Sequence, residues 1–141
     1  MALNTQLSNT AASLAADAIC GSAANNGYLR IYDGSQPANA NTVVSTQNLL
    51  CEITLPADVF DAAVNGVASL AATISGSVIY AGTNTAAWFR VLESNGSTVL
   101  WDGTIGTATA NMVLDSTSLS YGATVQITGW TFTVREATTG Y

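Results

Sequence analysis

Residues that could carry out chemistry are few in this chain, and the acidic ones are the only candidates for catalysis. Its 141 residues include no His and no Lys, with nine Asp or Glu and three Arg. Without His, the commonest general base and metal ligand is missing, and without Lys there is no Schiff-base chemistry. Any catalytic site would therefore have to be built from carboxylates.

Two short acidic patterns stand out from otherwise scattered carboxylates. Asp58 and Asp61 have the spacing of one helical turn, which is compatible with a Ca²⁺ site or an acid pair. Asp102-Gly-Thr repeats the aspartic-protease triplet, but only once and at the end of an expected hairpin. We interpret the first pair as solvated loop carboxylates and the triplet as turn chemistry. We therefore expect no enzyme, no cofactor and no metal site.

The two cysteines, Cys20 and Cys51, are isolated in the sequence, with no C-x-x-C motif and no His for a mixed zinc site. This spacing favours two small buried apolar residues. A disulfide between them remains an open alternative, although a protein made and assembled in the cytoplasm usually keeps both thiols reduced.

Charge and hydropathy limit the partners. The formal charge is −6 and only 9% of the residues are charged. Three Arg in an acidic chain neutralise a phosphate backbone poorly, and no stretch reaches the roughly 20 strongly apolar residues of a membrane helix. We therefore expect no nucleic acid and no membrane as partner. A surface of Thr, Ser, Asn and Ala is easily covered by another protein; the alternative is a Thr-rich β domain from an extracellular setting.

The N-terminal part predicts an arm followed by a helix. Residues 1–9 are polar and uncharged, and residues 10–141 are expected to form a single domain. Thr10 is a candidate N-cap for a helix over Ala11–Ile19 that ends near Gly21. Its expected packing stripe consists of Leu7, Ala11, Leu14 and Ala18.

Beyond Gly27 the apolar period changes from about 3.6 to 2, which is typical of strands. About eight strands are expected: 28–32, 49–55, 67–74, 77–80, two within 85–103, 111–114 and 125–134. Residues 34–47 form a long connection without a period. In the last strand the apolar parity switches between Ile127 and Trp130, which predicts a β-bulge at Gly129. These features predict a mainly β fold: an antiparallel, jelly-roll-like β-sandwich with one short N-terminal helix.

The strongest local signal is Asn95-Gly96 between two apolar runs, which predicts a hairpin with a type I′ turn. In that register Leu92 opposes Val99, Val91 opposes Leu100, and Arg90 opposes Trp101. Arg90 is also expected to lie beside a tryptophan indole. Both faces of such a hairpin are apolar. One is expected to meet a core and the other a helix or a second chain.

Partner contacts are therefore expected to use apolar residues of the arm together with large side chains of the strands. The interface candidates are Leu3, Leu7, Tyr28, Tyr32, Trp88, Arg90, Leu92 and Trp101. An alternative use of Trp88, Trp101 or Tyr32 is stacking on sugars.

The chain resembles a group of phage structural proteins. The resemblance rests on the Ala-rich N-terminal helix, Gly27-Tyr-Leu-Arg-Ile-Tyr-Asp-Gly34 with Gln36-Pro37, Thr85-Ala-Ala-Trp-Phe-Arg90 and Val99-Leu-Trp-Asp-Gly-Thr-Ile-Gly106. These segments resemble the capsid cement (decoration) proteins of tailed bacteriophages, such as that of a Bordetella phage. No functional residue is carried over from the family.

The resemblance implies a jelly-roll-like protein that oligomerises on the outer capsid surface of the virion and clamps neighbouring capsomers. Its implied partners are the major capsid protein and further copies of itself, after assembly in the host cytoplasm. For the homo-oligomer we expect a dimer rather than a trimer. The alternative function is a tail, fibre or head-spike module that binds a host surface glycan.

Overall fold

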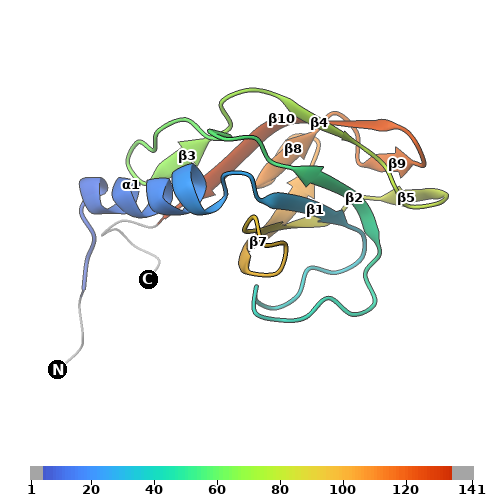
Figure 1. The fold of residues 1–141 in the computed structure, drawn as a ribbon, viewed down its shortest axis with the longest axis horizontal. Helices are drawn as coiled ribbons and strands as arrows, with labels where there is room; N and C mark the ends of the chain where they lie inside the picture. Colours follow the sequence, from blue (N-terminus) through green and yellow to red (C-terminus); the bar gives the residue numbers. More distant parts are fainter. Residues whose placement is uncertain (1–4, 135–141) are drawn as a thin grey trace.

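The structure, a computed structural model, describes residues 5–134 and is mainly β with one short helical segment (Figure 1). Helix α1 spans Asn9–Ala18 and continues into a π-helical turn, η1, over Ile19–Ala23. The strands are β1 (Tyr28–Tyr32), β2 (Leu49–Thr54), β3 (Val67–Ser69), β4 (Ile74–Ser77), β5 (Thr83–Thr85), β6 (Trp88–Leu92), β7 (Val99–Gly106), β8 (Met112–Leu114), β9 (Ser118–Ser120) and β10 (Thr124–Thr133). The expected strand at 67–74 is divided between β3 and β4, and the one at 77–80 is reduced to a bridge at Val78.

Eight strands form one mixed sheet in the order β2-β1-β6-β7-β8-β10-β3, with β4 also pairing with β10, while β5 and β9 form a separate ribbon. The expectation of a purely antiparallel sheet is wrong at β7 and β8, which pair in parallel. Residues 107–111 bring the chain back to the level of Thr104 before β8 begins, so the two strands run in the same direction. The Asn111 Oδ1 atom accepts hydrogen bonds from the Thr104 backbone N–H and hydroxyl, both at 3.0 Å, and so holds the start of β8 against β7.

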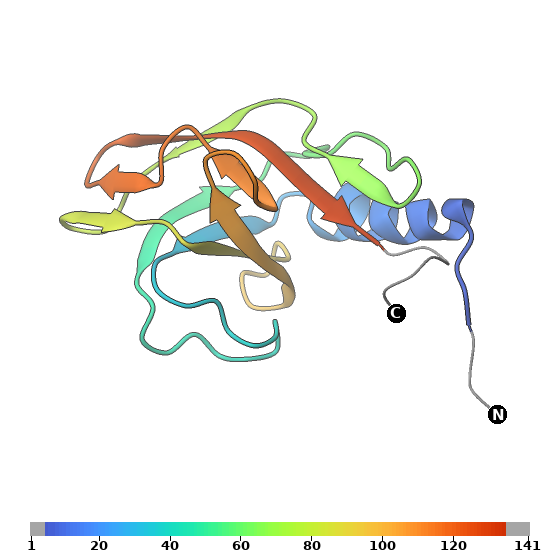
Figure 2. The ribbon, with the colours of Figure 1, turned by 180° about the vertical axis from the view of Figure 1, so that it is seen from behind.

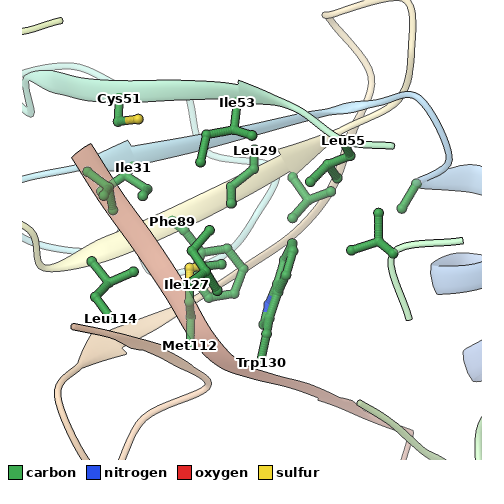
Figure 3. Close-up of a cluster of buried hydrophobic side chains, with 14 of the residues drawn as sticks. Leu29, Ile31, Cys51, Ile53, Leu55, Phe89, Met112, Leu114, Ile127 and Trp130 are labelled. Carbon is green, nitrogen blue, oxygen red and sulfur yellow. The ribbon is translucent and has the colours of Figure 1, made fainter. Parts of the chain in front are cut away.

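The sheet curls until its edge strand β2 meets the segment that follows β4. The Ile79 N–H donates to the Leu50 carbonyl at 2.9 Å, and Cys51 forms an isolated bridge with Val78. Two halves of the sheet therefore face one another, and β10 runs along one of them toward α1 (Figure 2). Figure 3 shows the core between the halves, with side chains of β1, β2 and β6 directed toward Leu114, Ile127 and Trp130.

Helix α1 packs through its smallest side chains. Ser8, not the expected Thr10, is the N-cap, because its hydroxyl accepts from the Ala11 N–H at 3.1 Å. The buried residues of α1 are Ala12 and Ala16, whereas Leu14 is 66% exposed, so the predicted stripe is wrong. The methyl side chains allow a close approach of α1 to the segment before β3, where the Gly66 N–H donates to the Ser13 hydroxyl and the Ala63 N–H to the Asp17 carboxylate.

The β6–β7 hairpin forms as expected, but its turn and part of its register differ. The Gly96 N–H donates to the Glu93 carbonyl at 3.0 Å, and only Gly96 of the Asn95-Gly96 pair has a positive φ, so the type I′ prediction is wrong. Leu92 opposes Val99 as predicted. Beyond that pair the register shifts at Leu100, and the predicted pairings of Val91 with Leu100 and of Arg90 with Trp101 are both wrong.

The shift has two consequences. Val91 now opposes Trp101, which places that indole on the core side, 5.9 Å from the Trp130 ring. Arg90 now opposes Asp102 in place of Trp101, and the indole that lies beside Arg90 is that of Trp88. The irregularity expected in the last strand is confirmed: β10 shifts register against β8 between Ile127 and Gly129, and the buried residues continue across it.

Candidate functional site: a charged row beneath the 34–47 loop

Four charged side chains occupy one level across four adjacent strands. Arg30 of β1 opposes Glu52 of β2 on one side and Arg90 of β6 on the other. Arg90 in turn opposes Asp102 of β7. Like charges directly opposite one another destabilise a sheet, whereas opposite charges stabilise it. The row is tolerated because each guanidinium has a carboxylate on its outer side.

The inner pair of this row, Arg90 with Asp102, is buried. Two hydrogen bonds join them, from Arg90 Nε to Asp102 Oδ1 at 2.7 Å and from Nη2 to Oδ2 at 2.9 Å. The side chains are only 6% and 3% exposed. The hydrogen bond with Asp102 raises the pKa of Arg90, despite its burial. This is the bidentate geometry in which a charge-assisted pair is strongest.

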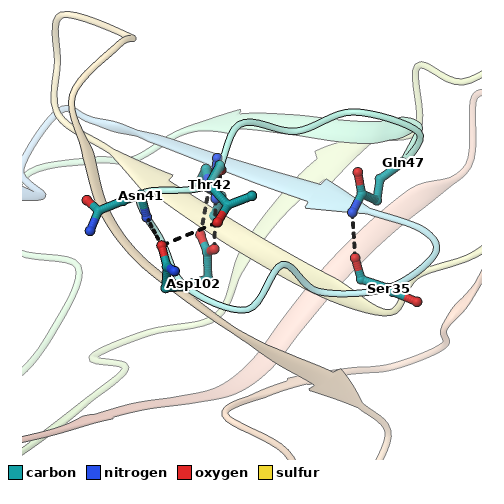
Figure 4. Close-up of polar contacts among 7 residues, drawn as sticks. Ser35, Asn41, Thr42, Gln47 and Asp102 are labelled. Carbon is teal, nitrogen blue, oxygen red and sulfur yellow. Dashed lines mark hydrogen bonds and ion pairs between the residues drawn. The ribbon is translucent and has the colours of Figure 1, made fainter.

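Arg90 also holds the loop that lies above it. Its Nη2 donates to the Thr42 carbonyl at 2.9 Å, and its guanidinium carbon lies 5.5 Å from the Trp88 ring centroid. Figure 4 shows Thr42 and Asp102 close together, with Asn41 beside them. Residues 34–47 contain no charged side chain, so Arg90 supplies an ionic group to which this neutral segment is attached.

The outer pair, Arg30 with Glu52, is partly exposed. Arg30 Nε donates to Glu52 Oε2 at 2.7 Å, and the side chains are 30% and 35% exposed. Burial alone would lower the pKa of Arg30, but the hydrogen bond and charge of Glu52 raise it overall. Arg30 therefore stays a cation at the edge of the covered face.

A polar network fixes both ends of the 34–47 loop. The carboxylate of Asp33 accepts from the backbone and side-chain nitrogens of Asn48 and, at 2.7 Å, from Asn84 Nδ2. Burial alone would raise the pKa of Asp33, but these hydrogen bonds lower it overall. Within the loop, Gln47 Nε2 donates to the Ser35 carbonyl at 2.6 Å, a contact visible in Figure 4. The loop is thus tied down at its base as well as at Thr42.

A pocket of about 280 Å³ lies between the loop and the sheet and opens to solvent. Its lining combines both arginines of the row with apolar and neutral groups: Arg30, Tyr32, Ala40, Asn41, Thr42, Val43, Val44, Arg90 and Leu92.

Four of the interface candidates meet on the face beneath this loop. Tyr32, Trp88, Arg90 and Leu92 are all buried, and the Tyr32 and Trp88 rings are stacked with centroids 4.6 Å apart. The second apolar face of the hairpin was expected to meet a helix or a second chain; instead, the protein's own loop covers it. A partner or a sugar could reach Trp88 only after the loop had moved.

The remaining candidates are dispersed. Tyr28 is half-buried and lies near the hairpin turn, while Trp101 is half-buried on the opposite face, beside Phe60, Trp130 and Phe132. Leu7 is half-buried, and Leu3 lies outside the described residues.

The residues considered for catalysis lie either at the surface or in an ion pair. Asp58 and Asp61 are exposed, and no group of three or more His, Cys, Asp or Glu side chains within residues 5–134 is placed to hold a metal ion. Asp102 lies within β7 and binds Arg90, so its interpretation as a turn residue is wrong. Cys20 and Cys51 are free and buried. No helix in the described part of the chain is long and apolar enough to cross a membrane.

Among the described residues, five large apolar side chains are exposed: Leu14, Val43, Val64, Ile79 and Tyr121. Sequence reasoning did not predict the exposure of most of them. The one available signal was at Val43, which lies in an aperiodic, charge-free segment; the pattern around Leu14 favoured burial instead. The pocket was also missed, because the loop and the strands that form it include segments far apart in the sequence that meet only in the folded chain.

Comparison of the chain with protein-family models, with curated proteins and with solved structures gives no match.

Proposed function

We propose that this chain is a non-enzymatic structural protein of a bacteriophage virion, which binds the outside of the icosahedral head and cements neighbouring capsomers. The observation that carries the proposal is the low content of charged residues: 9% of the residues are charged, and both described arginines are paired within the chain. A surface made mostly of neutral polar groups loses little hydration energy when another protein covers it.

Exposed apolar side chains also make the surface suitable for contact with another protein. Leu14, Val64 and Val43 come from the helix, the loop before β3 and the 34–47 loop, while Ile79 and Tyr121 lie near the β5–β9 ribbon. Single exposed apolar residues are common on soluble proteins. On a lattice, however, many weak contacts act together, so modest affinity at each copy suffices.

The proposed partners are the major capsid protein and further copies of this chain, in a homo-oligomer for which we favour a dimer over a trimer. The proposed place is the outer capsid surface of the virion, after assembly in the host cytoplasm. A jelly-roll-like sandwich is part of the same proposal, and the two facing halves of the curled sheet support it. Of the three aromatic residues considered for the glycan-binding alternative, Trp88 and Tyr32 are covered and only Trp101 is half-buried.

The test is co-sedimentation of the purified chain with phage heads that lack it. The proposal predicts saturable binding at a fixed ratio to the coat protein, and its absence would overturn the proposal. Changing Leu14, Val43, Val64, Ile79 or Tyr121 singly to Ser identifies the contact surface, with Thr109→Ser as an exposed control. At least one of the five should weaken binding about tenfold, since burying a large apolar side chain contributes roughly 1.5–3 kcal/mol.

A further inference from the structure

The two arginines that line the pocket differ in how many of their donors are occupied. Asp102 takes two donors of Arg90, and the Thr42 carbonyl accepts from one of the same nitrogens. Glu52 accepts only from the Nε donor of Arg30, and the Tyr32 hydroxyl interacts with the same guanidinium. Because a guanidinium carries five N–H donors, Arg30 has more donors than the described residues have acceptors for it.

These spare donors are in a suitable place to meet a ligand. Arg30 lines the open pocket and its side chain is 30% exposed, so it is partly desolvated but still reachable. The pocket lining includes no Asp or Glu, and residues 34–47 above it carry no charge. Tyr32, Leu92 and Val44 supply apolar surface. The pocket therefore combines one available cation with apolar walls.

We propose that this pocket binds a carboxylate group through the terminal nitrogens of Arg30. The planar guanidinium matches a carboxylate with two parallel hydrogen bonds, and the ligand's apolar stem then lies against Tyr32 and Leu92. At about 280 Å³ the pocket is slightly smaller than the range usual for drug-sized ligands, which suits a single side chain or a small acid. Two sources share this chemistry: an acidic side chain of a partner protein, and a free small carboxylate.

Two neighbouring groups shape the site. Glu52 competes with the ligand for Arg30, but partly exposed ion pairs are weak, so the guanidinium can exchange one carboxylate for another. Arg90 acts as a positioning residue, since its bond to the Thr42 carbonyl fixes the loop that forms the opposite wall. The proposed site requires only the isolated chain and does not depend on the capsid role.

The experiment is a ¹H–¹⁵N NMR titration of the purified full-length chain with matched pairs of probes. N-acetyl-glutamate amide is compared with N-acetyl-glutamine amide, and propionate with propionamide. The proposal predicts saturable shifts at the Arg30 Nε–H and at the Val43 and Val44 amides with the acids only. Tighter binding of the glutamate probe indicates a partner's side chain, and tighter binding of propionate indicates a small acid. Equal shifts with acid and amide would overturn the proposal.

Variants give opposite expectations around the same pocket. Arg30→Gln should weaken carboxylate binding at least tenfold, whereas Glu52→Gln should strengthen it several-fold by removing the competing acid. Thr109→Ser, on the exposed surface away from the pocket lining, should leave it unchanged. If Arg30→Gln does not fold, Arg30→Lys keeps the charge but loses the two-pronged geometry and should still weaken binding. Undiminished binding in the folded Arg30 variant would contradict the proposed site.

Discussion

Arg30 of β1 and Arg90 of β6 are direct cross-strand neighbours, yet their side chains are 30% and 6% exposed. Each is paired with a carboxylate on its far side, but the inner pair is buried and joined by two hydrogen bonds, whereas the outer pair is partly exposed and joined by one. An exposed pair contributes little to stability, whereas removing one partner of a buried pair leaves an uncompensated charge. The inner pair is therefore structural, and the outer pair is free to exchange partners.

The first prediction concerns this difference. Asp102→Asn should lower the free energy of unfolding by about 3–5 kcal/mol, because it leaves the Arg90 charge buried without its carboxylate. The matched change Glu52→Gln in the exposed pair should cost about 1 kcal/mol or less. Urea unfolding followed by tryptophan fluorescence measures both. Similar losses in the two variants would show that burial does not distinguish the pairs.

The second prediction concerns acid stability. The hydrogen bonds from Asn48 and Asn84 lower the pKa of Asp33 in the folded protein, against burial that acts to raise it. Asp33 thus contributes stability that is present above its unfolded pKa of about 3.9 and is lost as the pH falls through its lower folded pKa. The free energy of unfolding should fall less steeply for Asp33→Asn than for wild type between about pH 5 and pH 2. Parallel curves would contradict this role, whatever the offset between them.

Local patterns predicted the elements whose residues determine their own conformation. Tyr28–Tyr32 and Leu49–Thr54 alternate cleanly, and Gly129 marks a parity switch that allows only a bulge if the apolar face is to continue. The register of the sheet was harder to predict from the sequence. The shift at Leu100 depends on Trp101 finding room in the core and on Asp102 reaching Arg90, neither of which is encoded in the spacing of the hairpin.

The candidate site was harder to predict than the fold. The interface candidates Trp88, Arg90 and Leu92 do lie together on one face, but sequence reasoning expected a partner, and not a loop of the same chain, to cover them. Nothing in the composition of residues 34–47 showed that Thr42 would bind Arg90, because the contact joins a backbone carbonyl to a residue 48 positions away. The packing face of helix α1 was predicted wrongly for a related reason. Leu14 is the larger apolar side chain, yet only alanine fits where the helix closely approaches the segment before β3.

The third prediction concerns the thiols. Burial, with the charge of Asp17, raises the pKa of Cys20 to about 12, and burial, with the charge of Glu52, raises the pKa of Cys51 to about 11. Because only the thiolate reacts, neither thiol should react with Ellman's reagent in the folded protein at about pH 8. Denaturation without a reductant should release two reactive thiols. Rapid native labelling would contradict the burial, and no thiols after denaturation would indicate a disulfide.

The fourth prediction concerns the start of α1. Ser8→Ala removes the hydroxyl that accepts from the Ala11 N–H and should lower the free energy of unfolding by about 1 kcal/mol. Thr10→Ala, at the position expected from sequence, should have a clearly smaller effect. Chemical denaturation of the two variants decides between them. A larger loss from the Thr10 change would place the cap at Thr10 after all.

The fifth prediction concerns self-association. Arg30 and Arg90 are both paired within the chain, and Arg135 lies outside the described residues. With a charge of −6 per chain, added salt screens repulsion between copies and leaves apolar contacts intact or stronger. Sedimentation velocity should show an assembly that is maintained or strengthened from about 0.05 M to about 0.5 M NaCl. Dissociation over that range would mean that ion pairs hold it together.

The most direct test of the capsid role is cryo-electron microscopy of phage heads assembled with and without this chain, combined with measurement of their stability to heat. We predict density that fits the curled sheet on the outer surface at capsomer junctions, absent from heads that lack the chain, and a lower disruption temperature for those heads. Heads with no such density, or with unchanged stability after loss of the chain, would contradict the cementing role.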